Sequence, residues 1–131
     1  MSHYDSNTPP PVSSSGEDNT PAMLVHLSGI MFSFLVPLIV WLVNKDNPNK
    51  AFLNDQSKEA LNFHINVIVA SFALSIVGTI LSLVTFGLLA IVFVPLFIIF
   101  GIVLVVFMII AGLAAQKGEH YRYPFIYRVI K

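Results

Sequence analysis

The chain has 131 residues, of which 56% are hydrophobic and 11% are charged, and its formal net charge is zero. Soluble domains carry about 25% charged residues, so this composition argues against a soluble domain and favours an all-α protein built into a membrane. The sequence contains no cysteine, which excludes disulfides, a thiolate nucleophile, cysteine metal ligands and a lipidated cysteine.

Residues 1–21 form a polar segment rich in proline and serine. This segment buries too little apolar surface to offset the entropy lost on ordering, so we predict a disordered tail and place the membrane domain at residues 22–131. The tail has neither the basic region nor the apolar run of a signal peptide, so no cleavage is expected.

The first predicted membrane span covers residues 22–43. As a helix it reaches about 33 Å, which is enough to cross a hydrocarbon core of about 30 Å. Pro37 lies inside this span and predicts a kink. Trp41, near its end, suits the aromatic belt at the membrane surface.

Residues 44–58 form a polar connection that contains three lysines. Asp55 is a candidate N-cap for the helix that follows. Phe52 and Leu53, just before it, are expected to dip toward the membrane interface.

Residues 60–116 form an almost wholly apolar run that is too long for one span. A β-branched polar residue and a glycine at 85–87 predict a turn, which divides the run into spans at about 60–84 and 88–115. A further span within the run would put the basic residues of the loop and of the C-terminus on opposite faces. Because that violates the charge bias, we predict three spans in all.

The last segment, residues 117–131, alternates basic, aromatic and aliphatic residues and is too short to span. Its tyrosines suit the headgroup region, and its basic groups can reach lipid phosphates. We interpret it as an interfacial segment that holds the end of the third span at the membrane surface.

With three spans drawn, every basic residue falls on one face of the membrane. The positive-inside rule identifies that face as cytoplasmic. We therefore predict a three-helix bundle in the bacterial cytoplasmic membrane, multi-pass, with the N-terminus outside and the C-terminus in the cytoplasm. The basic residues are Lys45, Lys50, Lys58, Lys117, Arg122, Arg128 and Lys131.

Small and polar residues form stripes along the predicted spans. Such residues let helices approach closely in lipid, so the stripes predict helix packing, within the protein or against another subunit. The stripe of the first span consists of His26, Gly29, Ser33 and Pro37, and that of the third includes Gly101, Gly112 and Ala115. The second span carries His64, Ser71, Ser75, Gly78 and Ser82 on one line.

No residue pattern predicts a metal or catalytic site. His26 and His64 lie near opposite faces of the membrane in the predicted topology, about 20 Å or more apart, so a shared metal is not expected. Asn62, His64 and Asn66 leave two interpretations open. They line the cytoplasmic mouth of a transport or protein-translocation complex, or the asparagines simply bond to neighbouring helices or loop backbone.

Three stretches carry a resemblance to a known family. They are Ala22–Ser28 with Pro37–Leu42, Lys58–Phe63 and Gly118–Pro124. The chain resembles an uncharacterised family of small bacterial membrane proteins that is often grouped with the small hydrophobic subunit of the chloroplast Tic import translocon. It departs from the usual pattern at Ser57, where glycine is common, and at His64, where glutamine is commoner. The resemblance implies an integral membrane protein of unknown molecular function and supplies no catalytic residue.

We expect the distinctive contacts on the cytoplasmic face, with Glu59 and Arg122 as an ion pair. The predicted function is that of a non-enzymatic membrane component without a cofactor or metal. Its predicted partners are the lipid bilayer and a second copy or another membrane protein, and nucleic acid is not expected. The candidate interaction residues are His26, Pro37, Lys58, Glu59, Asn62, His64, Asn66, Tyr121, Arg122, Tyr123 and Pro124.

Overall fold

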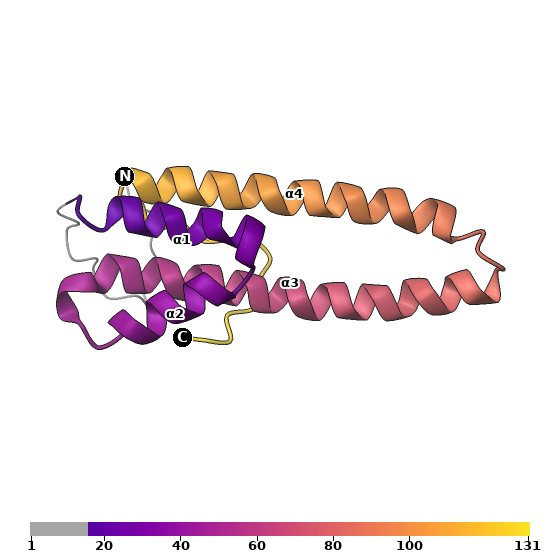
Figure 1. Ribbon diagram of the computed structural model, residues 1–131, viewed down its shortest axis with the longest axis horizontal. Helices are drawn as coiled ribbons and strands as arrows, with labels where there is room; N and C mark the ends of the chain where they lie inside the picture. Colours follow the sequence, from indigo (N-terminus) through magenta and orange to yellow (C-terminus); the bar gives the residue numbers. More distant parts are fainter. Residues whose placement is uncertain (1–15) are drawn as a thin grey trace.

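The computed structural model describes residues 16–131, and this part of the chain is helical without a β-strand. Its helices are α1 (Asn19–Phe32), α2 (Leu35–Asn44), the short 3-10 helix η1 (Pro48–Lys50), α3 (Ala51–Val84) and α4 (Ala90–Gln116) (Figure 1). The predicted all-α class is therefore confirmed. The third predicted span, residues 88–115, corresponds closely to α4, whereas α3 begins nine residues before the predicted second span at 60–84.

α3 and α4 form a long antiparallel pair joined by a tight turn (Figure 1). The turn covers residues 85–89, in agreement with the turn predicted at 85–87. Gly87 has a φ of +89°, which glycine adopts without strain, and its N–H donates to the Ser82 carbonyl over 2.7 Å. Two helical segments, Pro48–Val84 and Ala90–Gln116, are long and apolar enough to cross a membrane.

The segment predicted as the first span, residues 22–43, is a helical hairpin and not one straight helix. α1 ends at Phe32, Ser33 adopts a positive φ of 55°, and α2 runs back beside α1 (Figure 1). Pro37 lies in the first turn of α2, where no helical N–H donor is needed. In a continuous helix its ring would meet the carbonyl of Ser33, so the residue that predicted a kink accompanies a full reversal.

This hairpin returns the chain to the end at which α1 began. Thr20 Oγ1 donates to Gln116 Oε1 over 3.1 Å, and Lys50 Nζ lies 3.2 Å from Asp18 Oδ1. The start of α1 therefore lies beside the end of α4. The prediction of ends on opposite faces required residues 22–43 to cross the membrane as one helix, and the hairpin leaves that third span unconfirmed. Of the predicted tail, residues 19–21 begin α1, and residues 1–15 lie outside the described part of the chain.

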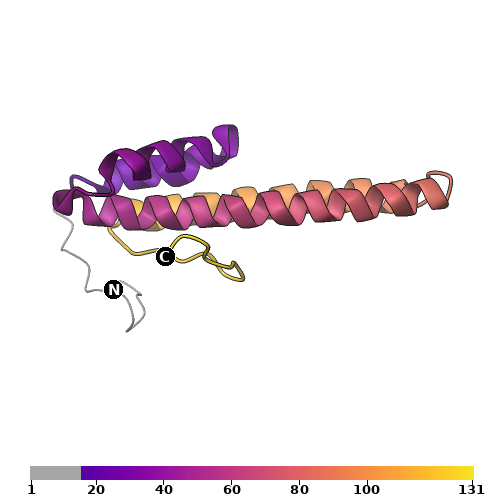
Figure 2. The same cartoon turned by 90° about the horizontal axis from the view of Figure 1, so that it is seen from below.

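The molecule divides along its length into a packed head and an open stalk. The head comprises residues 16–66 and 108–131, and the stalk comprises residues 67–107. Within the stalk only Gly78 is fully buried. In the head, α1 and α2 cover one side of the α3–α4 layer, and the C-terminal segment, residues 117–131, covers the other side (Figure 2). Two buried apolar clusters fill the head, namely Ala22, Val25, Phe52, Leu53, Ala60 and Ala115, and Phe63, Met108, Ala111 and Tyr123.

Small residues bring α1 close to α4. Ala111 and Ala115 have no exposed surface, and a Cβ atom on Gly112 would lie 3.0 Å from the side chain of Leu27. This is the packing expected of small residues between helices. Gly101 differs, because a Cβ atom there would meet nothing within 4 Å in the described chain.

Candidate functional site

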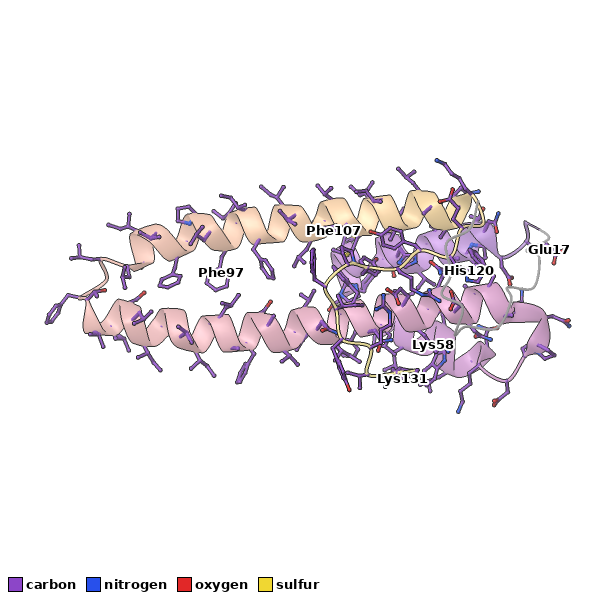
Figure 3. All side chains as sticks on the ribbon, turned by 180° about the vertical axis from the view of Figure 1, so that it is seen from behind. Glu17, Lys58, Phe97, Phe107, His120 and Lys131 are labelled. Atoms are coloured by element: carbon purple, nitrogen blue, oxygen red, sulfur yellow. The ribbon has the colours of Figure 1, made fainter. Side chains whose placement is uncertain are left out.

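A polar cluster lies in the head, where α3, α1 and the C-terminal segment meet. Figure 3 shows nitrogen and oxygen atoms gathered there, whereas the side chains of the stalk are almost entirely carbon. The α3 members recur at helical spacing and so share one face. They are Asp55, Gln56, Glu59, Asn62 and Asn66.

These residues lie on a helix because α3 starts at Ala51, earlier than predicted. Asp55 is therefore inside the helix and is not its N-cap. A cap does occur further upstream, where the Asn47 side chain accepts a hydrogen bond from the Asn49 N–H at the start of η1. Phe52 and Leu53 are buried in the core of the head and do not face the membrane interface.

Asp55 pairs with two basic side chains of the C-terminal segment. Arg122 donates from Nη2 to Asp55 Oδ1 over 2.7 Å and from Nη1 to Oδ2 over 3.0 Å, which is a two-point contact. His120 Nδ1 lies 2.7 Å from Asp55 Oδ2. The Asp55 carboxylate thus fixes the beginning of the C-terminal segment against α3.

Glu59 lies one turn further along α3, and its side chain is 3% exposed. Its carboxylate accepts from Arg128 Nε and Nη2 over 2.9 and 2.8 Å and from the Tyr123 N–H over 2.6 Å. The expected Glu59–Arg122 pair is therefore replaced by Asp55–Arg122 and Glu59–Arg128. Asp55 and Glu59 are only one helical turn apart, so charge alone did not decide which acid each arginine would reach.

Asn62 and Asn66 each bind the backbone N–H and carbonyl of one residue of the C-terminal segment. Asn62 donates to the Ile130 carbonyl and accepts from the Ile130 N–H, both over 2.8 Å. Asn66 makes the same pair of bonds with Tyr127. The two amides hold backbone that has no sheet partner, as the simpler of the two interpretations predicted.

Tyr123, in the C-terminal segment, connects this segment to both α1 and α3. It is 2% exposed, stacks on Phe63 with ring centroids 3.9 Å apart, and its hydroxyl lies 2.8 Å from His26 Nδ1. The other ring nitrogen of His26 lies 2.8 Å from the Gln56 carbonyl oxygen, which can only accept. His26 Nε2 therefore carries the hydrogen, and the Tyr123 hydroxyl donates to Nδ1. Burial raises the pKa of Tyr123 well above its ordinary value, which keeps this donor protonated.

His64 lies on the same side of the fold as His26. A Cβ atom on Gly29 would collide with His64 Nε2, so the imidazole packs directly on α1, three residues after His26. The expectation that the two histidines are about 20 Å apart was wrong, because residues 22–43 fold into a hairpin whose first helix packs on α3. His64 Nε2 is buried without a hydrogen-bond partner among residues 16–131, and this part of the chain contains no group of three or more candidate metal ligands.

The remaining predicted residues are spread over the head. Pro37 is buried in α2 and Lys58 is half-buried on α3, whereas Pro124 is exposed beside Phe125, which has a φ of 61°. Tyr121 makes edge contacts with the rings of His26 and Tyr123.

Four contributors to the polar cluster were not among the predicted interaction residues. They are Asp55, Gln56, His120 and Arg128. The helical spacing of Asp55, Glu59, Asn62 and Asn66 was a signal for this face of α3. It could have identified Asp55 and Gln56, had residues 51–59 been assigned to the helix.

Two long apolar helices and a head that is closed by buried polar contacts define a small all-α membrane protein. The chain belongs to the MamF/MmsF family, described as the magnetosome magnetite crystal formation protein family, which matches residues 17–130. No curated protein and no solved structure matches the chain.

This family agrees with the predicted class of small bacterial membrane protein. It gives no support to the predicted likeness to the chloroplast Tic translocon. The function of the polar cluster must therefore be argued from its own geometry.

Proposed function

We propose that this protein is a non-enzymatic integral component of the membrane around a magnetite crystal, and that it acts by associating with itself or with another membrane protein. The family description supports the setting. The chemistry of the head supports the non-enzymatic role, because Asp55, Glu59, Asn62 and Asn66 are engaged in holding the C-terminal segment.

The stalk is the observation that carries this proposal. Its two helical parts, residues 67–84 and 90–107, are each about 27 Å long, which accounts for most of a hydrocarbon core of about 30 Å. They contain no charged residue. Their large apolar side chains are exposed along the whole length, up to Phe86 in the turn at 97%. A surface of this kind is stable only against lipid or another apolar helix.

The charges support an orientation for this arrangement. All seven basic residues lie in the head, and none lies in the stalk or its turn. By the positive-inside rule the head belongs on the cytoplasmic side. Both described ends of the chain then lie in the cytoplasm, and the turn at 85–89 reaches the opposite face.

The transport alternative is less well supported. It assigned Asn62, His64 and Asn66 to the cytoplasmic mouth of a transport or protein-translocation complex. The amides of Asn62 and Asn66 instead bind the backbone of the C-terminal segment, and His64 packs on Gly29.

Deletion of the gene in a magnetite-forming cell tests the proposed role. We expect crystals of altered size or number inside membranes that still form, and restoration by the wild-type protein. Normal crystals in the deletion strain would contradict the proposed setting.

Association can be tested separately, because the natural chain has no cysteine. Gly101→Cys places a single thiol on the stalk, where the described chain leaves open space. We expect disulfide-linked dimers or a linked partner protein after oxidation of native membranes. Lys45→Cys, on the exposed loop of the head, is the matched control. Failure of Gly101→Cys to link to any protein would contradict association through this surface.

A further inference from the structure

The two sides of the head differ in charge. Residues 19–44, which form the α1–α2 hairpin, contain no charged side chain. The C-terminal segment covers the opposite side (Figure 2). It forms the Asp55–Arg122 and Glu59–Arg128 ion pairs with α3. Large apolar side chains of the hairpin are nevertheless exposed, namely Leu24, Ile30, Met31, Phe32, Phe34, Leu35, Ile39, Leu42 and Val43.

This apolar surface is too extensive to face water. Exposed apolar patches on soluble proteins seldom exceed a few hundred Å². The patch is also continuous with the apolar surface of the stalk, because the tip of the hairpin points toward the stalk (Figure 1). The same lipid that covers the stalk can therefore cover the hairpin.

The lengths of the helices fit this placement. α4 is uncharged over its whole length of about 40 Å, and such a helix fits a core of about 30 Å when it is inclined by about 40°. The inclination can lower one side of the head into the bilayer and raise the other. Contact with lipid lowers the free energy of the apolar side, and contact with water lowers the free energy of the side with the ion pairs.

The base of the hairpin has the character of a membrane surface. Trp41 lies one turn before the end of α2, and Lys45 Nζ lies 5.9 Å from the centre of its ring. An amphipathic ring next to a basic group is the usual arrangement at the headgroup level. α1 is about 21 Å long, so a hairpin that starts at this level ends near the middle of an inclined bilayer.

We propose that the α1–α2 hairpin is embedded in the lipid of one leaflet and makes the protein a wedge. This proposal rests on the two-crossing arrangement proposed above. The leaflet on the head side then contains four helices, and the other leaflet contains only α3 and α4. Extra cross-section in one leaflet favours membranes in which that leaflet is convex, so the protein prefers curved membranes of this sense.

Depth measurements test the embedding. A spin label on Met31→Cys, at the exposed tip, is expected to be accessible to oxygen and shielded from a water-soluble relaxation agent. A label on Val43→Cys, at the base, is expected to lie closer to the headgroups. Brominated lipids should quench Trp41, the single tryptophan, most strongly when the bromine is close to the headgroup. A tip label that is open to the aqueous agent, or shielded from both agents by a second copy, would overturn the proposal.

Curvature is tested by drawing thin tubules from giant vesicles that contain the labelled protein with its head outside. We expect the density on the tubule to exceed that on the flat parent membrane by about twofold or more. The pair Met31→Asn with Phe32→Asn makes the tip polar and should abolish this enrichment. The pair Leu42→Asn with Val43→Asn places the same groups at the base and should keep it.

The outcomes separate this proposal from the one before it. Equal density of the wild-type protein on tubule and parent membrane, with both chain ends labelled from one face, would overturn the wedge alone. Chain ends labelled from opposite faces would overturn the two-crossing arrangement as well. If the tip variant does not fold, the depth measurements on the spin-labelled chains and the tubule measurement on the wild-type protein still test the wedge.

Discussion

Tyr123 is the residue on which most of the head depends. Its ring stacks on Phe63 and shares a buried cluster with Met108 and Ala111 of α4, its N–H reaches Glu59, and its hydroxyl reaches His26 on α1. One residue of an irregular segment thus joins α1 and α3 through contacts that are buried and directional. A buried donor of this kind is costly to remove, because its acceptor stays behind without a partner.

Tyr123→Phe should therefore lower the free energy of unfolding by about 1–3 kcal/mol, since His26 Nδ1 loses its donor while the ring stacking is kept. The change can be followed by SDS titration of the protein in mild detergent. Tyr127→Phe is the matched control, because Tyr127 is 70% exposed, and it should change stability by less than about 0.5 kcal/mol. Equal effects of the two substitutions would show that the buried hydroxyl contributes nothing specific.

The ion pairs give a second prediction for single residues. A double-mutant cycle between Glu59 and Arg128 should show a coupling energy of about 1 kcal/mol or more, because their groups form two hydrogen bonds around a buried carboxylate. The same cycle between Glu59 and Arg122 should give a coupling near zero. The reverse order of the two coupling energies would restore the pair expected from the sequence.

At the scale of the elements, hydropathy located the apolar segments and misjudged one of them. The turn at 85–87 and the extent of α4 were predictable, because a glycine interrupts a long uncharged run. Residues 22–43 have the length and polarity of a span, and those quantities do not distinguish one crossing helix from two shorter helices. The local evidence for the reversal was Pro37, four residues after Ser33.

The start of α3 was not predicted, because its residues are polar and not apolar. Residues 51–59 are polar enough to suggest a surface loop, but their polar side chains form one face of a helix that binds the C-terminal segment. That segment forms neither a helix nor a strand, so its path and its pairing with Asp55 and Glu59 could not be predicted from the sequence. Of this face, the prediction named Glu59, Asn62 and Asn66 and missed Asp55 and Gln56, and it did not identify their individual partners.

Close approach of the hairpin to α3 gives a prediction for the elements. Gly29→Ala should destabilise the head by about 1–3 kcal/mol, because the new methyl group collides with His64 and with Met108 Sδ. Gly101→Ala makes the same change in an open part of α4 and should be neutral, or stabilising by up to about 1 kcal/mol through helix propensity. SDS titration of both variants measures the difference. Equal stability would contradict the packing of His64 on α1.

At the scale of the whole molecule, the hairpin changes what the distribution of charges implies. The basic residues predicted a cytoplasmic C-terminus, and this expectation is compatible with the fold. The expectation of an outside N-terminus depended on a third crossing, and the described chain instead brings Asp18 to within 3.2 Å of Lys50. In the arrangement that we propose, the charged head occupies one face, and only the turn at 85–89 reaches the other.

Labelling with a membrane-impermeant thiol reagent tests this arrangement most directly. Single-cysteine variants Gly16→Cys, Phe86→Cys and Lys131→Cys place a thiol at exposed positions at the start, the stalk turn and the end of the described chain. In sealed vesicles of one orientation, we predict that positions 16 and 131 react from the same face and position 86 only from the opposite face. Reaction of positions 16 and 131 from opposite faces would contradict the two-crossing arrangement and restore a third span.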